Sequence, residues 1–198
     1  ENVHDKLQSF NGILVAPGFG ERGVEGKIEA IKYVRLNNIP FFGICYGMQM
    51  AVIEYARNML KLDDANSTEV NPNTKNPVID LMEEQKNITE KGGTMRLGAW
   101  KCDITRETLC HSVYKTENIE ERHRHRYELN NKYLNQLEEN GLVASGKNKD
   151  TNLVEVVEVK EHPWFIGVQY HPEYKSTVLS PHPLFVSFVS AAILNKNK

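Results

Sequence analysis

The stretch IPFFGICYGMQMAVIEYARNML, residues 39–60, runs from an apolar segment through a tight glycine-flanked turn into a segment of helical spacing. After the turn, apolar residues such as Met48, Val52 and Tyr55 recur every three or four positions, which is typical of a helix. A Gly-x-nucleophile-x-Gly turn between a strand and a helix presents its central side chain at the carboxyl edge of a sheet. This stretch therefore predicts an α/β fold in which Cys45 is a nucleophile.

The residues upstream continue the alternation of strand and helix. Residues 13–16 form a short apolar run that enters a glycine-rich loop, and Ile28, Ile31 and Val34 repeat at helical spacing. Strands and helices that alternate through short loops favour parallel strands covered on both faces. We therefore expect an open, mostly parallel twisted sheet flanked by helices.

The rest of the chain is predicted to add an antiparallel strand excursion and a closing helix. Residues 182–196 predict an amphipathic helix, and the polar residues 63–93 predict a surface excursion with a short helix over residues 78–84. Three further segments have the composition of strands, at residues 94–104, 153–160 and 164–170.

Composition narrows the class of protein. The 198 residues carry 24 Lys and Arg against 26 Asp and Glu, a formal charge of −2, which gives no basic field for nucleic acid. No apolar run approaches the length of a membrane span, and the first ten residues lack the apolar core of a signal peptide. Three cysteines at unpatterned spacing are typical of a reducing compartment. We expect a cytoplasmic enzyme domain that binds neither nucleic acid nor membrane.

A cysteine nucleophile requires a base, and the base requires a group that orients it. Among the seven histidines, His171 follows the apolar strand at residues 164–170 and is expected at the same carboxyl edge as Cys45. Glu173 lies two residues further on, close enough to bind the imidazole and fix its tautomer. The sequence thus predicts a Cys-His-Glu triad. A metal site would be the competing use of the histidines, but no Cys-x-x-Cys or His-x-x-x-His spacing supports one.

The oxyanion of a tetrahedral intermediate needs hydrogen-bond donors, and the sequence offers two. The start of the helix after Cys45 offers the main-chain N–H of Tyr46. The loop APGFG, residues 16–20, must offer the other, and Pro17 has no backbone N–H. The prediction therefore falls on Gly18, whose missing Cβ admits a backbone conformation closed to other residues.

Five segments carry a resemblance to a known family. They are GICYGMQMAVIEYARN at 43–58, DANSTE at 64–69, GGTMRLGA at 92–99, ERHRHRYELNN at 121–131 and VQYHPEY at 168–174. Together they resemble the glutaminase domain of CTP synthases, a branch of the class I, or triad, glutamine amidotransferases. The cysteine turn and His-Pro-Glu are shared by the whole class, whereas the other segments are more specific to this branch.

The resemblance implies that L-glutamine is hydrolysed to glutamate and ammonia through a thioester on Cys45, with His171 moving protons and Glu173 orienting it. In the complete enzyme the ammonia would aminate UTP to CTP in a synthase domain that uses ATP and Mg²⁺, with GTP as an allosteric activator. No cofactor is implied for this domain, and the complete enzyme is implied to be a homo-oligomer, a tetramer. The resemblance thus implies that residues 1–198 are one glutaminase domain without its first strand. The N-terminal synthase domain is implied to be absent from this chain.

The resemblance also implies where glutamine binds. Glu69 would receive the substrate ammonium group and Arg126 would hold the other end of the amino acid, because each charge prefers a charged partner. His123 and His125 are expected to support the loop or to face the synthase domain. The residues implied to contact glutamine are Gly18, Tyr46, Gly47, Met48, Gln49, Glu69 and Arg126.

Two departures from the family and two alternatives complete the sequence analysis. Residues 16 and 17, Ala-Pro, stand where the family has Pro-Gly, and Tyr46 stands where it has leucine. One alternative is a glutaminase domain that serves GMP or carbamoyl phosphate synthesis, which the segment RHRHRYELNN argues against. The other is a non-catalytic regulatory module, which the intact Cys45, His171 and Glu173 argue against.

Overall fold

The computed structural model describes residues 2–81 and 95–197 and contains two sheets. The smaller sheet has the spatial order β3 (Asn66–Ser67), β4 (Pro77–Leu81) and β7 (Tyr127–Leu129). The larger sheet has the order β1 (Ile13–Val15), β2 (Phe41–Ile44), β10 (Phe165–Val168), β9 (Val154–Val159), β8 (Leu142–Lys147), β5 (Arg96–Ile104) and β6 (Asn118–His125).

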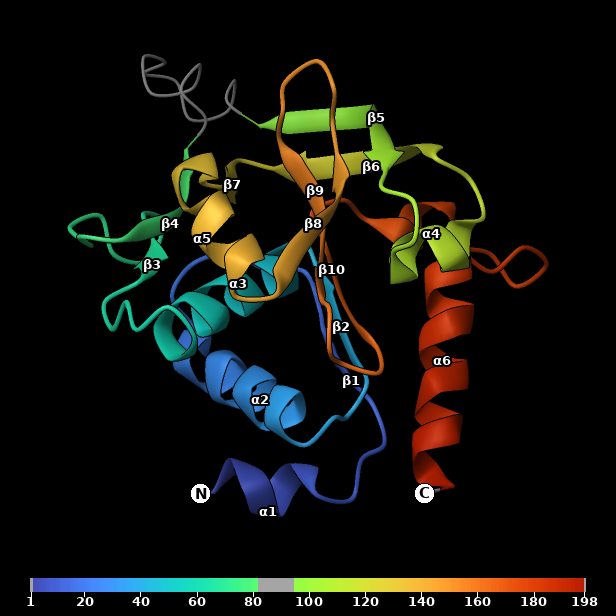
Figure 1. The fold of residues 1–198 in the computed structure, drawn as a ribbon, viewed down its shortest axis with the longest axis horizontal. Helices are drawn as coiled ribbons and strands as arrows, with labels where there is room; N and C mark the ends of the chain where they lie inside the picture. Colours follow the sequence, from blue (N-terminus) through green and yellow to red (C-terminus); the bar gives the residue numbers. More distant parts are fainter. Residues whose placement is uncertain (1, 82–94, 198) are drawn as a thin grey trace.

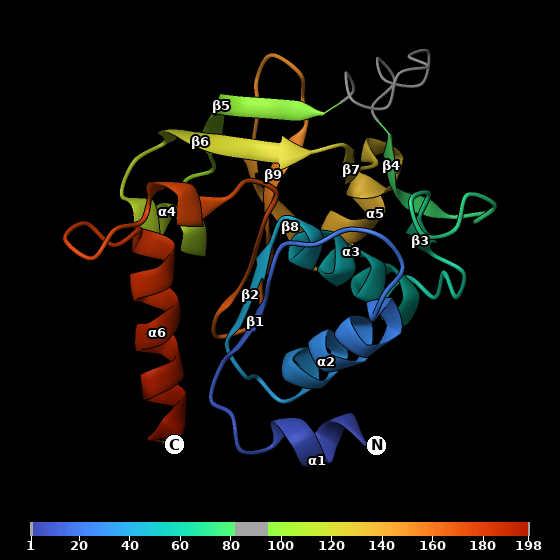
Figure 2. The ribbon, with the colours of Figure 1, turned by 180° about the vertical axis from the view of Figure 1, so that it is seen from behind.

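Helices cover both faces of the larger sheet. In Figures 1 and 2, α2 and α3 lie on one side of β1, β2 and β10, and α6 lies on the other side. Two short 3-10 helices follow β7 and β10, namely η3 (Asn131–Tyr133) and η4 (Pro172–Lys175). The α-helices are α1 (Val3–Leu7), α2 (Val24–Leu36), α3 (Tyr46–Asn58), α4 (Leu109–Tyr114), α5 (Leu134–Glu139) and α6 (Pro183–Lys196).

The larger sheet joins a parallel part to an antiparallel part. β2 pairs in parallel with β1 and with β10, whereas the pairs from β10 through β9, β8 and β5 to β6 are antiparallel. All four residues of β2 and of β10 are buried, as expected for parallel strands covered on both faces. The sequence-based prediction of an α/β sheet flanked by helices, with an antiparallel excursion, is confirmed.

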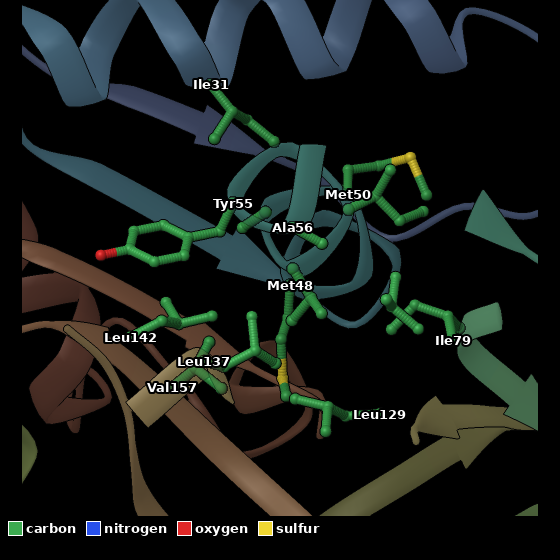
Figure 3. Packing of buried hydrophobic residues seen from close by; sticks show 14 of the residues in the cluster. Ile31, Met48, Met50, Tyr55, Ala56, Ile79, Leu129, Leu137, Leu142 and Val157 are labelled. Carbon is green, nitrogen blue, oxygen red and sulfur yellow. The ribbon is translucent and has the colours of Figure 1, made fainter. Parts of the chain in front are cut away.

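The helix α3 fills the centre of the molecule. Its eleven residues from Tyr46 to Ala56 are all buried, although the sequence suggested a single apolar stripe. Figure 3 shows Met48 of this helix near Leu129 and Leu137, which come from β7 and α5. A second apolar cluster lies on the other side of the larger sheet, where Phe42 and Trp164 face the rings of α6.

One predicted element is wrong. The short helix expected over residues 78–84 is, as far as the described residues reach, the strand β4. Val78 and Ile79 are fully buried, and β4 pairs antiparallel with β7, almost fifty residues later in the chain. The remainder of the predicted helix, from residue 82, lies outside the described residues. Within residues 2–81 and 95–197, no helix has the length and apolarity to cross a membrane.

Candidate active site

The turn from β2 into α3 holds Cys45 in an unusual backbone conformation. Its φ and ψ are 51° and −101°, a region that residues other than glycine seldom occupy. A Cβ on Gly47 would lie 2.2 Å from the carbonyl oxygen of Val15, and one on Gly43 would lie 2.7 Å from the carbonyl carbon of Gly47. Only glycine allows β1, β2 and α3 to meet this closely, so the two glycines fix the place of the cysteine.

The neighbouring strand brings the other catalytic candidates to the same edge. β10 runs parallel to β2, and the Cys45 N–H donates to the carbonyl oxygen of Val168, the last residue of β10, at 2.7 Å. Because the carboxyl ends of parallel strands lie side by side, the residues that follow Val168 emerge next to Cys45. Gln169 and His171 are therefore placed beside the cysteine by sheet pairing.

His171 is held by three neighbours. Its Nδ1 lies 2.6 Å from Oε1 of Glu173, and its main-chain N–H donates to the carbonyl oxygen of Arg122 at 2.8 Å. The ring of Tyr174 stacks on the imidazole with centroids 5.0 Å apart and an interplanar angle of 11°. His171 Nε2 has no hydrogen-bond partner among the described residues. The Glu173 contact thus fixes the ring and leaves Nε2 available to move a proton.

A cavity of about 620 Å³ opens over these residues. It also brings in side chains that the sequence did not point to, among them Phe19, Arg124 and Tyr174. The predicted site residues that line it are Gly18, Cys45, Gln49, Glu69, Arg126, His171 and Glu173.

Three predicted contact residues are not in the lining. Tyr46 begins α3, Gly47 packs its backbone against Val15, and the Met48 side chain is in the apolar core (Figure 3). Any contact of Gly47 or Met48 with a substrate would therefore be made by the main chain.

The loop that carries Gly18 is tied to the rest of the site at Gly20. The Tyr46 hydroxyl donates to the Gly20 carbonyl oxygen, and Oε1 of Glu69 accepts from the Gly20 N–H at 3.1 Å. The side chain of Tyr46 thus has a specific contact in this chain. Gly18 has no left-handed backbone conformation, and a Cβ there would have an ordinary contact of 3.4 Å with the Tyr46 ring. The left-handed conformation that the missing Cβ would admit is therefore not adopted by Gly18 in this structure.

The surroundings of Cys45 favour the neutral thiol. Burial raises its pKa to about 12, and the carboxylates of Glu128, Glu173 and Glu69 act in the same direction. The main-chain N–H of Tyr46 donates toward the sulfur and lowers the pKa. A thiolate at this position therefore depends on hydrogen-bond donors and on a base beside it.

Two buried histidines form a pair at the cavity, which His125 lines. Nδ1 of His123 lies 2.8 Å from Nε2 of His125, and Nδ1 of His125 lies 3.2 Å from the carbonyl oxygen of Tyr127. Burial lowers the pKa of His123 to about 2 and that of His125 to about 3, so both imidazoles are neutral. Arg96 bridges the nearby carboxylates of Glu155 at 2.7 Å and Glu128 at 3.6 Å.

Across the part of the chain that the structure describes, no group of three or more His, Cys, Asp or Glu side chains is placed to hold an ion. Cys102 and Cys110 are buried in the second apolar cluster, away from the cavity lining. The polar residues of the cavity can instead supply a nucleophile, a base and partners for a charged small molecule.

Comparisons with known sequences give one family. A family model described as glutamine amidotransferase class-I matches residues 1–191. The chain is 69% identical over 193 residues to a CTP synthase of Flavobacterium johnsoniae and 60% identical over 196 residues to one of Clostridium perfringens. These alignments cover 98% and 99% of this chain but 36% and 37% of the relatives. The chain therefore spans little more than a third of the length of these curated relatives.

Solved structures agree with this result. The glutaminase domain of Trypanosoma brucei CTPS with bound acivicin has a TM-score of 0.90 and 40% sequence identity, covering 96% of this chain and 74% of that one. A putative GMP synthase component from Thermoplasma acidophilum, at 15% identity and a TM-score of 0.63 over 98% of this chain and 78% of that one, shares the fold alone. The chain belongs to the glutamine amidotransferase class-I family, and within it the similarity is to the glutaminase domains of CTP synthases.

Proposed function

We propose that the chain hydrolyses L-glutamine to glutamate and ammonia with Cys45, His171 and Glu173 as its catalytic triad. The observation that carries the proposal is the shared cavity: the strained turn at Cys45 and the His171–Glu173 pair line one pocket, at the ends of adjacent parallel strands. Neither Cys102 nor Cys110 lines this pocket, so neither lies beside the His171–Glu173 pair there.

The proposed reaction has two halves. The Cys45 sulfur attacks the side-chain amide carbon while His171 takes the thiol proton, and a tetrahedral oxyanion forms. The C–N bond then breaks, and His171 passes the proton to the departing nitrogen, which leaves as ammonia. Water attacks the remaining thioester, gives one proton to His171, and releases glutamate as that proton returns to the sulfur. Glu173 keeps the imidazole in the tautomer that both halves require.

The substrate contacts follow from charge and from main-chain donors. The N–H groups of Gly18 and Tyr46 would hold the oxyanion, because Tyr46 is the first residue of α3 and has no intrahelical partner for its N–H. Glu69 would bind the substrate ammonium group and Arg126 its carboxylate. The remaining contacts would come from Gln49 and from the backbone at residues 46–48.

The wider role is also a proposal. High identity to CTP synthases, against 15% to the GMP synthase component, supports ammonia supply to the amination of UTP to CTP. The partner would be a synthase domain of the same polypeptide, which uses ATP and Mg²⁺ and responds to GTP, in a homo-oligomeric cytoplasmic enzyme.

The proposal is tested by a glutaminase assay combined with acivicin, the ligand of the Trypanosoma brucei glutaminase domain. We expect glutamate release by this chain, alone or with an added synthase domain and GTP, and covalent labelling of Cys45 mapped by mass spectrometry. Labelling of Cys102 or Cys110 instead would contradict the assignment of the nucleophile. Absence of glutamate under all these conditions would contradict the activity.

His171→Ala should slow glutamine turnover by up to about 10⁴-fold, because it removes the group that moves both protons. Glu173→Ala should have a smaller effect, because the imidazole can still act when it is less well oriented. Steady-state kcat values for the two variants, normalised to folded protein, check this order. His182→Asn is a matched control, since it also breaks a buried His–Glu contact, 2.9 Å to Glu121, but lies outside the cavity lining. An equal or larger loss in Glu173→Ala would show that the roles are wrongly assigned.

A further inference from the structure

Gln169 is a buried polar residue that lies beside the candidate nucleophile. The proposed reaction gives Gln169 no role. It is the first residue after β10, its side chain is fully buried, and its main-chain N–H donates to the carbonyl oxygen of Glu155 at 2.8 Å. An amide without exposure to water needs hydrogen-bond partners for its polar atoms. The partners that it has are both residues of the candidate site.

The Gln169 side chain bridges Cys45 and Gln49. Its Nε2 lies 3.7 Å from the sulfur of Cys45, and its Oε1 lies 3.2 Å from Nε2 of Gln49. The same Gln49 nitrogen lies 2.9 Å from the main-chain carbonyl oxygen of Tyr127. A chain of hydrogen bonds thus runs from the backbone of β7, through two amides, to the sulfur.

The direction of this chain is set at its outer end. The Tyr127 carbonyl can only accept, so the Gln49 atom that faces it must be the NH₂ group. The Gln169 atom that faces this NH₂ group must then be an acceptor, because two NH₂ groups would oppose each other. Gln169 therefore turns its own NH₂ group, a donor, toward the sulfur of Cys45.

We infer that Gln169 is a positioning residue for the proposed reaction: it donates a hydrogen bond to the Cys45 sulfur and orients the Gln49 amide toward the substrate. The inference rests on the proposed function of the cavity. It has two chemical consequences, one for the sulfur and one for Gln49.

At the sulfur, a hydrogen bond to an anion is stronger than one to a neutral group, so the Gln169 donor stabilises the thiolate over the thiol. The groups that face Cys45 otherwise favour the thiol, apart from the Tyr46 N–H and the base His171. The opposing carboxylates are those of Glu69, Glu128 and Glu173, which come from three different segments of the chain. Gln169 thus adds a second fixed donor in a place where acidic groups predominate.

At Gln49, the NH₂ group is fully used by Tyr127 and Gln169. The polar atom that remains is Oε1, which accepts no hydrogen bond from the described residues, and Gln49 lines the cavity. An acceptor in that place favours a substrate group that carries N–H bonds and disfavours a carboxylate. Gln49 oriented in this way would favour the glutamine carboxamide over the carboxylate of the product, glutamate.

The test follows alkylation of Cys45 by iodoacetamide, which does not require glutamine turnover. Gln169→Met keeps the size of the side chain and removes the donor. We expect the alkylation of Cys45, measured on its peptide by mass spectrometry, to slow about 10- to 100-fold at each pH from 7 to 9. The curve of alkylation rate against pH should move up by about one to two pH units, because the thiolate loses a donor. Tyr170→Phe is the matched control, because it removes a neighbouring buried hydrogen bond, 3.0 Å to Tyr114, without touching the sulfur.

An unchanged profile in folded Gln169→Met, or an equal shift in Tyr170→Phe, would overturn the inference. If Gln169→Met does not fold, the unaltered chain gives the answer by NMR. The side-chain ¹⁵Nε2 resonance of Gln169 should shift when Cys45 is alkylated, and a resonance that stays in place would overturn the inference. Glutamine hydrolysis with an unchanged profile would leave the proposed function standing and remove only the role of Gln169. A shifted pH profile of alkylation without glutamine hydrolysis would support the hydrogen bond from Gln169 to Cys45 and contradict the proposed function.

Discussion

A Cys45→Ala variant should lower the kcat for glutamine hydrolysis by on the order of 10⁶, the scale seen when the nucleophile of a hydrolase triad is removed. The reason is chemical, because no other group in the cavity lining can form the thioester. The fold should persist, since alanine can replace a small buried side chain at this turn with the loss of few contacts. Glutamate release measured over hours, with circular dichroism as the check on folding, gives the result.

Two controls separate loss of chemistry from loss of structure. Cys110→Ala removes a thiol that is equally buried but lies in the second apolar cluster, and it should retain turnover. In a complete enzyme, Cys45→Ala should still form CTP when ammonium is supplied, because added ammonia bypasses this domain. Residual hydrolysis within tenfold of the unaltered chain would show that Cys45 is not the nucleophile.

Gly47→Ala should destabilise the fold by more than about 4 kcal/mol, which is exceptional for the addition of one methyl group. The new Cβ would lie 2.2 Å from the Val15 carbonyl oxygen, and both atoms belong to rigid elements, α3 and β1. Relief would require the central helix to move away from the sheet, which would expose the core between them. The measurement is the free energy of unfolding in urea, or its loss altogether if the variant does not fold.

Gly26→Ala provides the matched comparison for that experiment. Gly26 lies in α2 with no other atom within 4 Å of its would-be Cβ, so alanine should raise the free energy of unfolding by about 0.5–1 kcal/mol. Opposite signs for the two substitutions would show that the close approach at Gly47 decides the outcome. Similar, small effects at both positions would contradict the geometry of the turn.

The fold could be predicted largely because its local signals agree with its tertiary contacts. In the stretch from Phe41 to Asn58, the apolar run, the two glycines and the helical spacing each specify the same strand, turn and helix. The error at β4 has the opposite cause. A short segment such as residues 78–81, with three apolar residues out of four, suits either a strand or a helix, and the pairing with β7, far away in the chain, selects the strand.

The residues of the candidate site also fall into two groups, those that local sequence patterns indicate and those that only tertiary contacts bring together. Cys45, His171 and Glu173 lie in local patterns that carry their chemistry, and the structure places all three at one cavity. Gln169 was missed although it lies two residues before His171, the spacing that puts two side chains on one face of an extended segment. Its side-chain partners, Cys45 and Gln49, lie more than a hundred residues earlier in the chain, and Gln49 is in turn held by Tyr127 of β7, so only folding brings these residues together. The contact between Tyr46 and Gly20 was missed for the same reason.

The burial of α3 from Tyr46 to Ala56 has a consequence for the order in which parts of the molecule unfold. Buried elements exchange their amide hydrogens only when the whole protein unfolds, whereas exposed loops open at almost no cost in free energy. Cys45 and the Tyr46 amide begin the most buried helix, while Gly18 belongs to a loop in which the Phe19 side chain is 85% exposed. The proposed nucleophile therefore lies at the start of the last segment to open, and the Gly18 amide, the other proposed oxyanion donor, lies in one of the first. Under heat or denaturant, we expect the loop that carries Gly18 and Phe19 to open while Cys45 is still in its native position.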